Sequence, residues 1–156
     1  MSRVAYVDEH SVSTDATPER AWEVVSRLGG DERFYTPRGL WRVRGRVDRL
    51  LGGPGHRIAG TGRPLRPGDP LDFWEVVEVR PPSRVRIRAL SVLPGTAYLD
   101  VAVRPQGAGS RLTLRTEFEP AGVAGHVLWW AELPAHAVVL ALMTRRLAAL
   151  VGRHPG

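Results

Sequence analysis

The sequence has 156 residues, a net charge of +6 and 43% hydrophobic residues, which predicts a single domain with enough apolar surface for its own core. It contains no cysteine, and all 22 basic residues are arginine. Disulfides, thiolate nucleophiles or metal ligands, Schiff-base lysines and Walker-type phosphate loops are therefore excluded. No signal peptide is visible, and the longest stretch without charge, histidine or proline, residues 137–144, is shorter than the ~20 residues of a membrane span. We therefore expect a cytoplasmic protein that does not span a membrane.

The N-terminal part predicts a strand followed by two short helices. Residues 3–13 are typical of a strand, although their alternation is imperfect. Thr17, Pro18 and Glu19 then provide a helix N-cap, a proline at the first helical position and an acidic first turn. This helix is expected to end at the glycine pair 29–30. A second helix is predicted over residues 38–51, with one apolar face and one arginine-rich face.

The middle of the chain predicts a run of antiparallel strands. Turns rich in glycine and proline separate five segments that are expected to be strands: residues 56–63, 71–79, 84–92, 96–104 and 111–119. In the last three segments, apolar residues alternate with polar residues, many of them arginine. One apolar face and one polar face on each strand indicate an antiparallel sheet that is wet on one side only.

The C-terminal part predicts one long apolar helix over residues 122–151, interrupted at Pro134. Its expected stripe has near-heptad spacing and consists of His126, Trp130, Leu133, Ala137, Leu140, Thr144, Leu147 and Val151. So much apolar surface on one helix must be covered, and the dry face of the sheet is the expected partner. The fold class is therefore α+β.

This order of elements resembles the START-like, or SRPBCC, helix-grip superfamily. Residues 14–22 (TDATPERAW) resemble its junction between first strand and first helix, and residues 78–84 (EVRPPSR) resemble one of its common turns between strands. The resemblance implies a curved antiparallel sheet wrapped around the C-terminal helix, with two short helices after the first strand. It also implies a cavity between the sheet and that helix.

A closer resemblance is to an uncharacterised bacterial family within this superfamily. Four motifs carry it: residues 40–45 (LWRVRG), 68–74 (GDPLDFW), 93–99 (LPGTAYL) and 129–136 (WWAELPAH). The similarity extends from about residue 4 to residue 150. Members often follow a Rossmann domain of the atypical short-chain dehydrogenase type, and these 156 residues contain no such domain. The family has no assigned activity, so membership implies a cavity but no reaction.

Glu132 and His136 form the first candidate catalytic pair. They are four residues apart on the predicted helix and therefore share a face. A carboxylate beside an imidazole can fix its tautomer and raise its basicity, as general acid–base catalysis requires. Trp129 and Met143, on nearby turns, would line the site as ligand-binding residues. The alternative is structural: Pro134 bends the helix, and His136 binds a carbonyl that the bend frees.

Glu75 is the second candidate catalytic residue, and its role depends on which face of its strand points inward. If Val77 and Val79 face the core, Glu75 shares their face, where it acts as a general acid or pairs with an arginine. The opposite register instead directs Asp72 and Trp74 into the cavity as ligand-binding residues. A bulge in the strand would allow parts of both arrangements, so both remain open.

The other candidate ligand-binding residues are Tyr35, Trp41, His126 and Trp130. Tyr35 and Trp41 flank a segment that in the helix-grip superfamily often borders the cavity mouth, and for all four residues ordinary packing is the alternative. We expect no cofactor and no metal, because no dinucleotide loop, nucleophile elbow or set of metal ligands is recognisable.

Three functions remain. The first is binding of a small hydrophobic or aromatic metabolite in the cavity. The second is a cofactor-independent cyclase, dehydratase or isomerase that uses an acid–base pair in that cavity. The third is binding of an arginine-rich face to an anionic surface. No aromatic residues interleave with the arginines of the outer strands, so we expect no nucleic-acid partner. The oligomeric state is left open.

Overall fold

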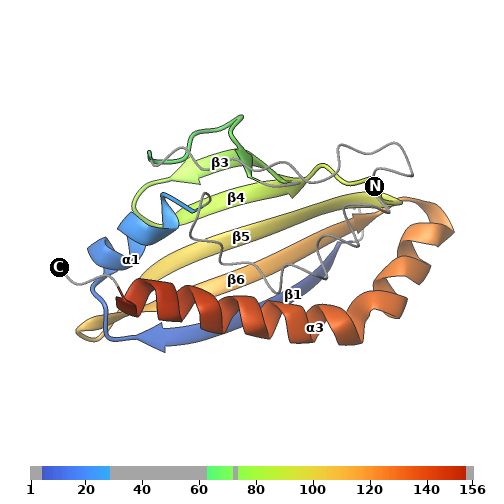
Figure 1. Cartoon of the computed structure of the whole chain (residues 1–156). Helices are drawn as coiled ribbons and strands as arrows, with labels where there is room; N and C mark the ends of the chain where they lie inside the picture. Colours follow the sequence, from blue (N-terminus) through green and yellow to red (C-terminus); the bar gives the residue numbers. More distant parts are fainter. Residues whose placement is uncertain (1–4, 29–62, 72–73, 154–156) are drawn as a thin grey trace.

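A curved antiparallel sheet and one long helix form the frame of the protein (Figure 1). The computed structural model describes residues 5–28, 63–71 and 74–153. The strands are β1 (Tyr6–Thr14), β2 (Pro70–Leu71), β3 (Trp74–Arg80), β4 (Arg84–Ala89), β5 (Gly95–Gln106) and β6 (Gly109–Pro120), and the helices are α1 (Pro18–Val25) and α3 (Gly122–Arg153). The strand order is β1-β6-β5-β4-β3-β2. The predicted antiparallel sheet is confirmed, whereas the predicted helix over residues 38–51 and nearly all of the predicted strand over residues 56–63 lie outside the described residues.

Helix α1 begins where its cap predicts. The hydroxyl of Thr17 accepts a hydrogen bond from the backbone N–H of Arg20 at 3.3 Å, and Pro18 occupies the first turn. The helix ends at Val25, before the expected glycine pair. Ala21 and Val25 are fully buried, so α1 is held to the core by its apolar face.

The concave face of the sheet carries the core. The alternation predicted for β4, β5 and β6 is confirmed, since their inward residues are almost completely buried: Val85, Ile87, Leu99, Val101, Val103, Leu112 and Leu114. β5 and β6 pair along their whole length, from Gly95 opposite Pro120 to Gln106 opposite Gly109. Residues of this long hairpin form part of the cavity wall described below.

The convex face carries ion pairs between strands. Arg86 on β4 donates to Asp100 on β5 at 2.8 Å, and Arg88 on β4 donates to Glu75 on β3 at 2.7 Å. Arg84 contacts Glu78 and Asp100. Asp100 is only 4% exposed, and this burial raises its pKa although Arg86 and Arg84 act in the opposite direction. These arginines are therefore engaged with carboxylates of the same sheet.

Helix α3 lies along the sheet and packs against β1 and β6 (Figure 1). It is one helix from Gly122 to Arg153 with Pro134 inside it, so the predicted interruption is a change of direction and not a break. Leu140 and Leu147 are among its buried residues. Its outward face is apolar too, so α3 is long and apolar enough to cross a membrane by length and composition alone. In this fold α3 is the core helix.

Candidate functional site

A cavity of about 130 Å³ lies between α3 and the concave face of the sheet. Seventeen residues from β3, β4, the β4–β5 connection, β5, β6 and α3 line it: Trp74, Ala89, Ser91, Leu93, Ala97, Tyr98, Leu99, Thr116, Glu117, Phe118, Leu128, Trp129, Glu132, His136, Val139, Leu140 and Met143. Most of them are apolar. An apolar cavity of about 150 Å³ holds a benzene ring, so this one fits a single aromatic ring, with room for a larger molecule to extend through its open side.

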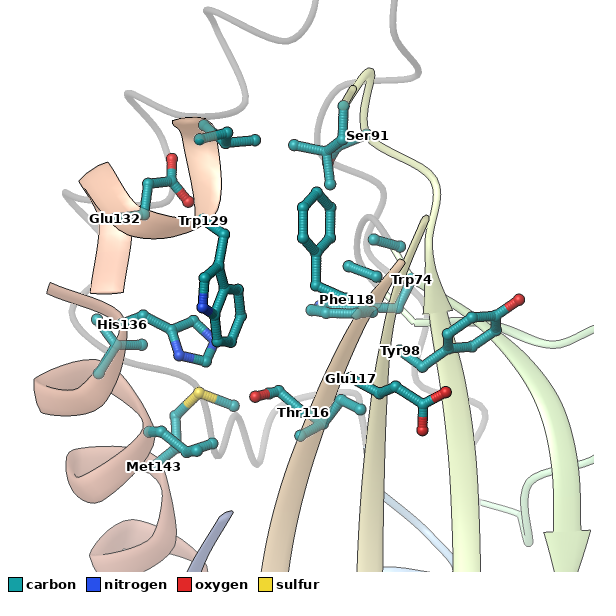
Figure 2. Close-up of a pocket in the computed structure, with 17 residues that line it drawn as sticks. Trp74, Ser91, Tyr98, Thr116, Glu117, Phe118, Trp129, Glu132, His136 and Met143 are labelled. Atoms are coloured by element: carbon teal, nitrogen blue, oxygen red, sulfur yellow. The ribbon is translucent and has the colours of Figure 1, made fainter. Parts of the chain in front are cut away.

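Aromatic rings form one side of the cavity. Figure 2 shows Trp129 of α3 and Phe118 of β6 between the helix and the sheet. Their rings are nearly parallel, with centroids 6.1 Å apart and an interplanar angle of 9°. Tyr6 of β1 stacks on Trp129 with a centroid separation of 5.1 Å. Such stacked rings offer flat, rigid surfaces to an aromatic ligand.

The polar part of the cavity centres on His136. Its ring extends from α3 below Trp129 (Figure 2), with the two ring centroids 5.6 Å apart. The Nδ1 atom of His136 lies 3.4 Å from Oδ2 of Asp8 on β1. Both atoms are buried, and neither forms a hydrogen bond with another described residue. The other oxygen of Asp8, Oδ1, lies 3.8 Å from Nε2 of His10.

Further polar groups border the cavity. Glu132, one turn before His136 on α3, is exposed at the cavity edge. The hydroxyl of Thr116 on β6 donates to the backbone carbonyl of Asp8 at 3.3 Å, which links the strand bearing Asp8 to the cavity wall. No group of three or more histidine, aspartate or glutamate side chains in the described part of the chain could hold a metal ion. The polar side chains that border the cavity can form hydrogen bonds and transfer protons.

Most of the chain matches the model of one protein family. Residues 1–143 match the family described as "Protein of unknown function (DUF2867)". The chain belongs to this family. A search of curated proteins found no match to this chain.

Several solved structures share this fold. Truncated norcoclaurine synthase from Thalictrum flavum is 17% identical, with a TM-score of 0.60 over 99% of this chain and 98% of that chain. A protein from Arthrobacter aurescens is 14% identical, with a TM-score of 0.56 over 96% and 88%. DynU16, a putative protein in the dynemicin biosynthetic locus, is 18% identical, with a TM-score of 0.52 over 94% of this chain and 47% of that chain. The helix-grip fold expected from the sequence is confirmed, and at these identities the likeness concerns the fold alone.

The structure brings five of the sequence-predicted site residues to one place. Trp74, Trp129, Glu132, His136 and Met143 all line the cavity. Tyr35, Trp41 and Asp72 lie outside the described residues.

Of the two registers left open for this strand, the structure has the one that directs Trp74 inward, so Glu75 does not line the cavity and its candidate catalytic role is not supported. A bulge shifts the register of β3 against β4 between Val76 and Glu78. Before the bulge Trp74 lines the cavity and Val76 is buried, and after it Val79 packs against the core. Because both ends of the strand direct apolar residues inward, Glu75 falls on the convex face, where it pairs with Arg88.

The prediction that His126 and Trp130 are ligand-binding residues of the cavity is wrong. Trp130 is 63% exposed, and His126 accepts or donates a hydrogen bond with the Tyr6 hydroxyl at 2.8 Å; neither lines the cavity. A strict seven-residue repeat drifts by about 20° per heptad on a straight helix. The residues that actually face the sheet recur at helical spacing from a point one residue earlier: Gly125, Trp129, Glu132, His136, Leu140, Met143, Leu147 and Val151.

Sequence reasoning missed Asp8. The signal was present in β1, where Tyr6, Asp8, His10 and Val12 alternate on one face, but an aspartate on an apparently irregular edge strand gives no hint of its partner. Phe118 and Thr116 belong to the strand predicted over residues 111–119, and the structure adds that they border the cavity.

Proposed function

We propose that this protein binds a small hydrophobic or aromatic molecule in the cavity between the sheet and α3. The observation that carries the proposal is the lining itself: parallel aromatic rings and aliphatic side chains enclose a space of about 130 Å³, with a few polar groups on one side. Binding sites for small molecules have this composition, in which apolar walls supply affinity and a few polar groups set orientation.

Native mass spectrometry of the freshly purified protein, with the denatured protein as reference, is the first test. A small adduct that is lost on denaturation is expected, and its mass would indicate the chemical class of the ligand. A clean apo mass would argue against a tightly held ligand and leave weaker, exchangeable binding to be measured with a probe.

Toluene is a suitable probe, because its single ring matches the cavity. Ligand-observed NMR titration should show saturable binding to the wild-type protein. Ala97 lines the cavity, so Ala97→Leu would fill part of it and weaken toluene binding at least fivefold. Ala102, on the same strand, lies on the opposite face, and Ala102→Leu is the matched control. Equal toluene binding by both variants, or none by the wild type, would contradict the proposal.

A second candidate function is a cofactor-independent cyclase, dehydratase or isomerase. His136 favours it, because a partly buried carboxylate beside a cavity-lining imidazole is suited to general acid–base catalysis. In such a reaction a proton would move from the substrate to the imidazole, the electron pair would stay on the substrate, and Asp8 would balance the imidazolium charge. His136→Ala should then abolish turnover of the co-purifying compound while the circular dichroism spectrum stays unchanged. Undiminished turnover would contradict this reading.

The remaining expectations stay predictions. They are a cytoplasmic location, the absence of a nucleic-acid partner, and an association of related chains with a Rossmann domain.

A further inference from the structure

The most informative cluster in the molecule joins two elements that are far apart in the sequence. Asp8 on β1 and His136 on α3 meet at 3.4 Å beside the cavity. Both side chains are largely shielded, with relative exposures of 23% and 28%, and the two facing atoms are fully buried. A buried polar atom without a hydrogen bond is costly, so Oδ2 and Nδ1 gain most when a proton lies between them.

This arrangement decides which ring nitrogen is protonated. An ionised carboxylate only accepts hydrogen bonds, so it favours the tautomer of His136 that carries its proton on Nδ1. In the neutral ring the proton can sit on one nitrogen only. Nε2, the ring nitrogen that does not contact Asp8, is then unprotonated and can accept a hydrogen bond. Because His136 lines the cavity, Nε2 is available to a bound molecule.

We infer that Asp8 positions His136 as a hydrogen-bond acceptor, so that the cavity selects small aromatic or enolic ligands that carry an acidic O–H group. The inference rests on the proposed binding function and narrows its ligand class. The aromatic wall of Trp129 and Phe118 takes the ring, and Nε2 of His136 accepts the hydroxyl proton in a hydrogen bond. His10, which lies 3.8 Å from the other oxygen of Asp8, is the second ionisable neighbour of this carboxylate.

Phenol and toluene test this selectivity, because they differ only by a hydroxyl in place of a methyl group. Their dissociation constants would be measured by ligand-observed NMR on the full chain at about pH 8.5, where an ordinary histidine is neutral. We expect the wild-type protein to bind phenol about three to ten times more tightly than toluene, the usual effect of one hydrogen bond. His136→Ala should remove this preference while toluene still binds.

Asp8→Asn tests the positioning role. An asparagine amide can donate to Nδ1 and so favour the opposite tautomer, with the proton on Nε2. The variant should lose most of the preference for phenol, and long-range ¹H–¹⁵N spectra should show the proton of the His136 ring moving from Nδ1 to Nε2. Glu9→Gln is the matched control, since Glu9 is the next residue of β1 and is exposed. It should change neither the preference nor the tautomer.

The outcomes separate the inference from the proposed function. If toluene and phenol bind the wild type equally well, the cavity binds ligands but His136 does not select a hydroxyl, and the inference is overturned. The same holds if Asp8→Asn leaves both the tautomer and the preference unchanged. If neither probe binds, the binding function itself fails and the inference fails with it.

Discussion

Two leucines on α3 allow a direct test of the cavity. Leu140 borders it and is 2% exposed, whereas Leu147, two turns later on the same face, is fully buried in the core and does not border it. Replacing either residue by alanine removes three carbon atoms, which costs about 2.4 kcal/mol of transfer free energy at ~0.8 kcal/mol for each carbon. The new void adds a further cost that brings Leu→Ala substitutions to about 2.7–5.0 kcal/mol.

The two variants should differ in this second contribution. Leu147 has packed atoms on all sides, so Leu147→Ala should cost about 3.5–5 kcal/mol. Leu140 already faces empty space on one side and has fewer contacts to lose there, so Leu140→Ala should cost only about 2.5–3 kcal/mol. The free energies of unfolding would be compared by urea denaturation of the apo protein, followed by circular dichroism at 222 nm. A difference of 1 kcal/mol corresponds to about 2–4 °C in Tm.

A loss for Leu140→Ala that equals or exceeds the loss for Leu147→Ala would refute the reasoning. It would mean that the space beside Leu140 is filled in the apo protein, so that the cavity is not available to a ligand. The comparison is valid only if both variants show the same slope of unfolding free energy against urea concentration as the wild type. A changed slope would indicate a different unfolded or native state.

Three further predictions concern single sites. Gly125→Ala should destabilise the protein by about 1–3 kcal/mol in thermal unfolding, because the added Cβ would lie 2.8 Å from Cβ of Pro120 and closer still to the carbonyl oxygen of Pro94. Gly152→Ala is the control. Its added Cβ would have nothing within 4 Å, so this substitution should stabilise α3 by up to about 1 kcal/mol. Trp129→Ala should abolish toluene binding, while Trp130→Ala should leave the dissociation constant unchanged; equal losses would contradict the assigned rotation of α3. Hydrogen bonds from Arg63 and from the backbone N–H of Arg66 lower the pKa of Asp69, so its stabilising contribution is complete above about pH 4 and is lost as the pH falls through the lowered pKa. Asp69→Asn should therefore flatten the dependence of Tm on pH between about pH 4 and pH 2, and an unchanged slope would contradict the assignment.

The sequence by itself determined the elements whose signals are local. The N-cap of α1 follows from Thr17 and Pro18, because a cap needs only the next few residues. The inward faces of β5 and β6 follow from strict alternation, because neighbouring side chains of a strand point to opposite faces. The long helix and its burial against the sheet follow from its amount of apolar surface. The helix-grip resemblance then supplied the cavity.

Only the tertiary structure decided how these faces are turned toward each other. The bulge in β3 is set by pairing with β4, and it allows Trp74 and Val76 before it and Val79 after it to face inward, which leaves Glu75 outward. Both sides of α3 are apolar, so the sequence leaves the rotation of the helix about its axis ambiguous. Packing against β1 and β6 fixes this rotation and directs Trp129, not Trp130, into the cavity. The partner of His136 came from β1, at the other end of the chain, and not from its own helix. Such contacts depend on which elements lie side by side, and no local pattern records that.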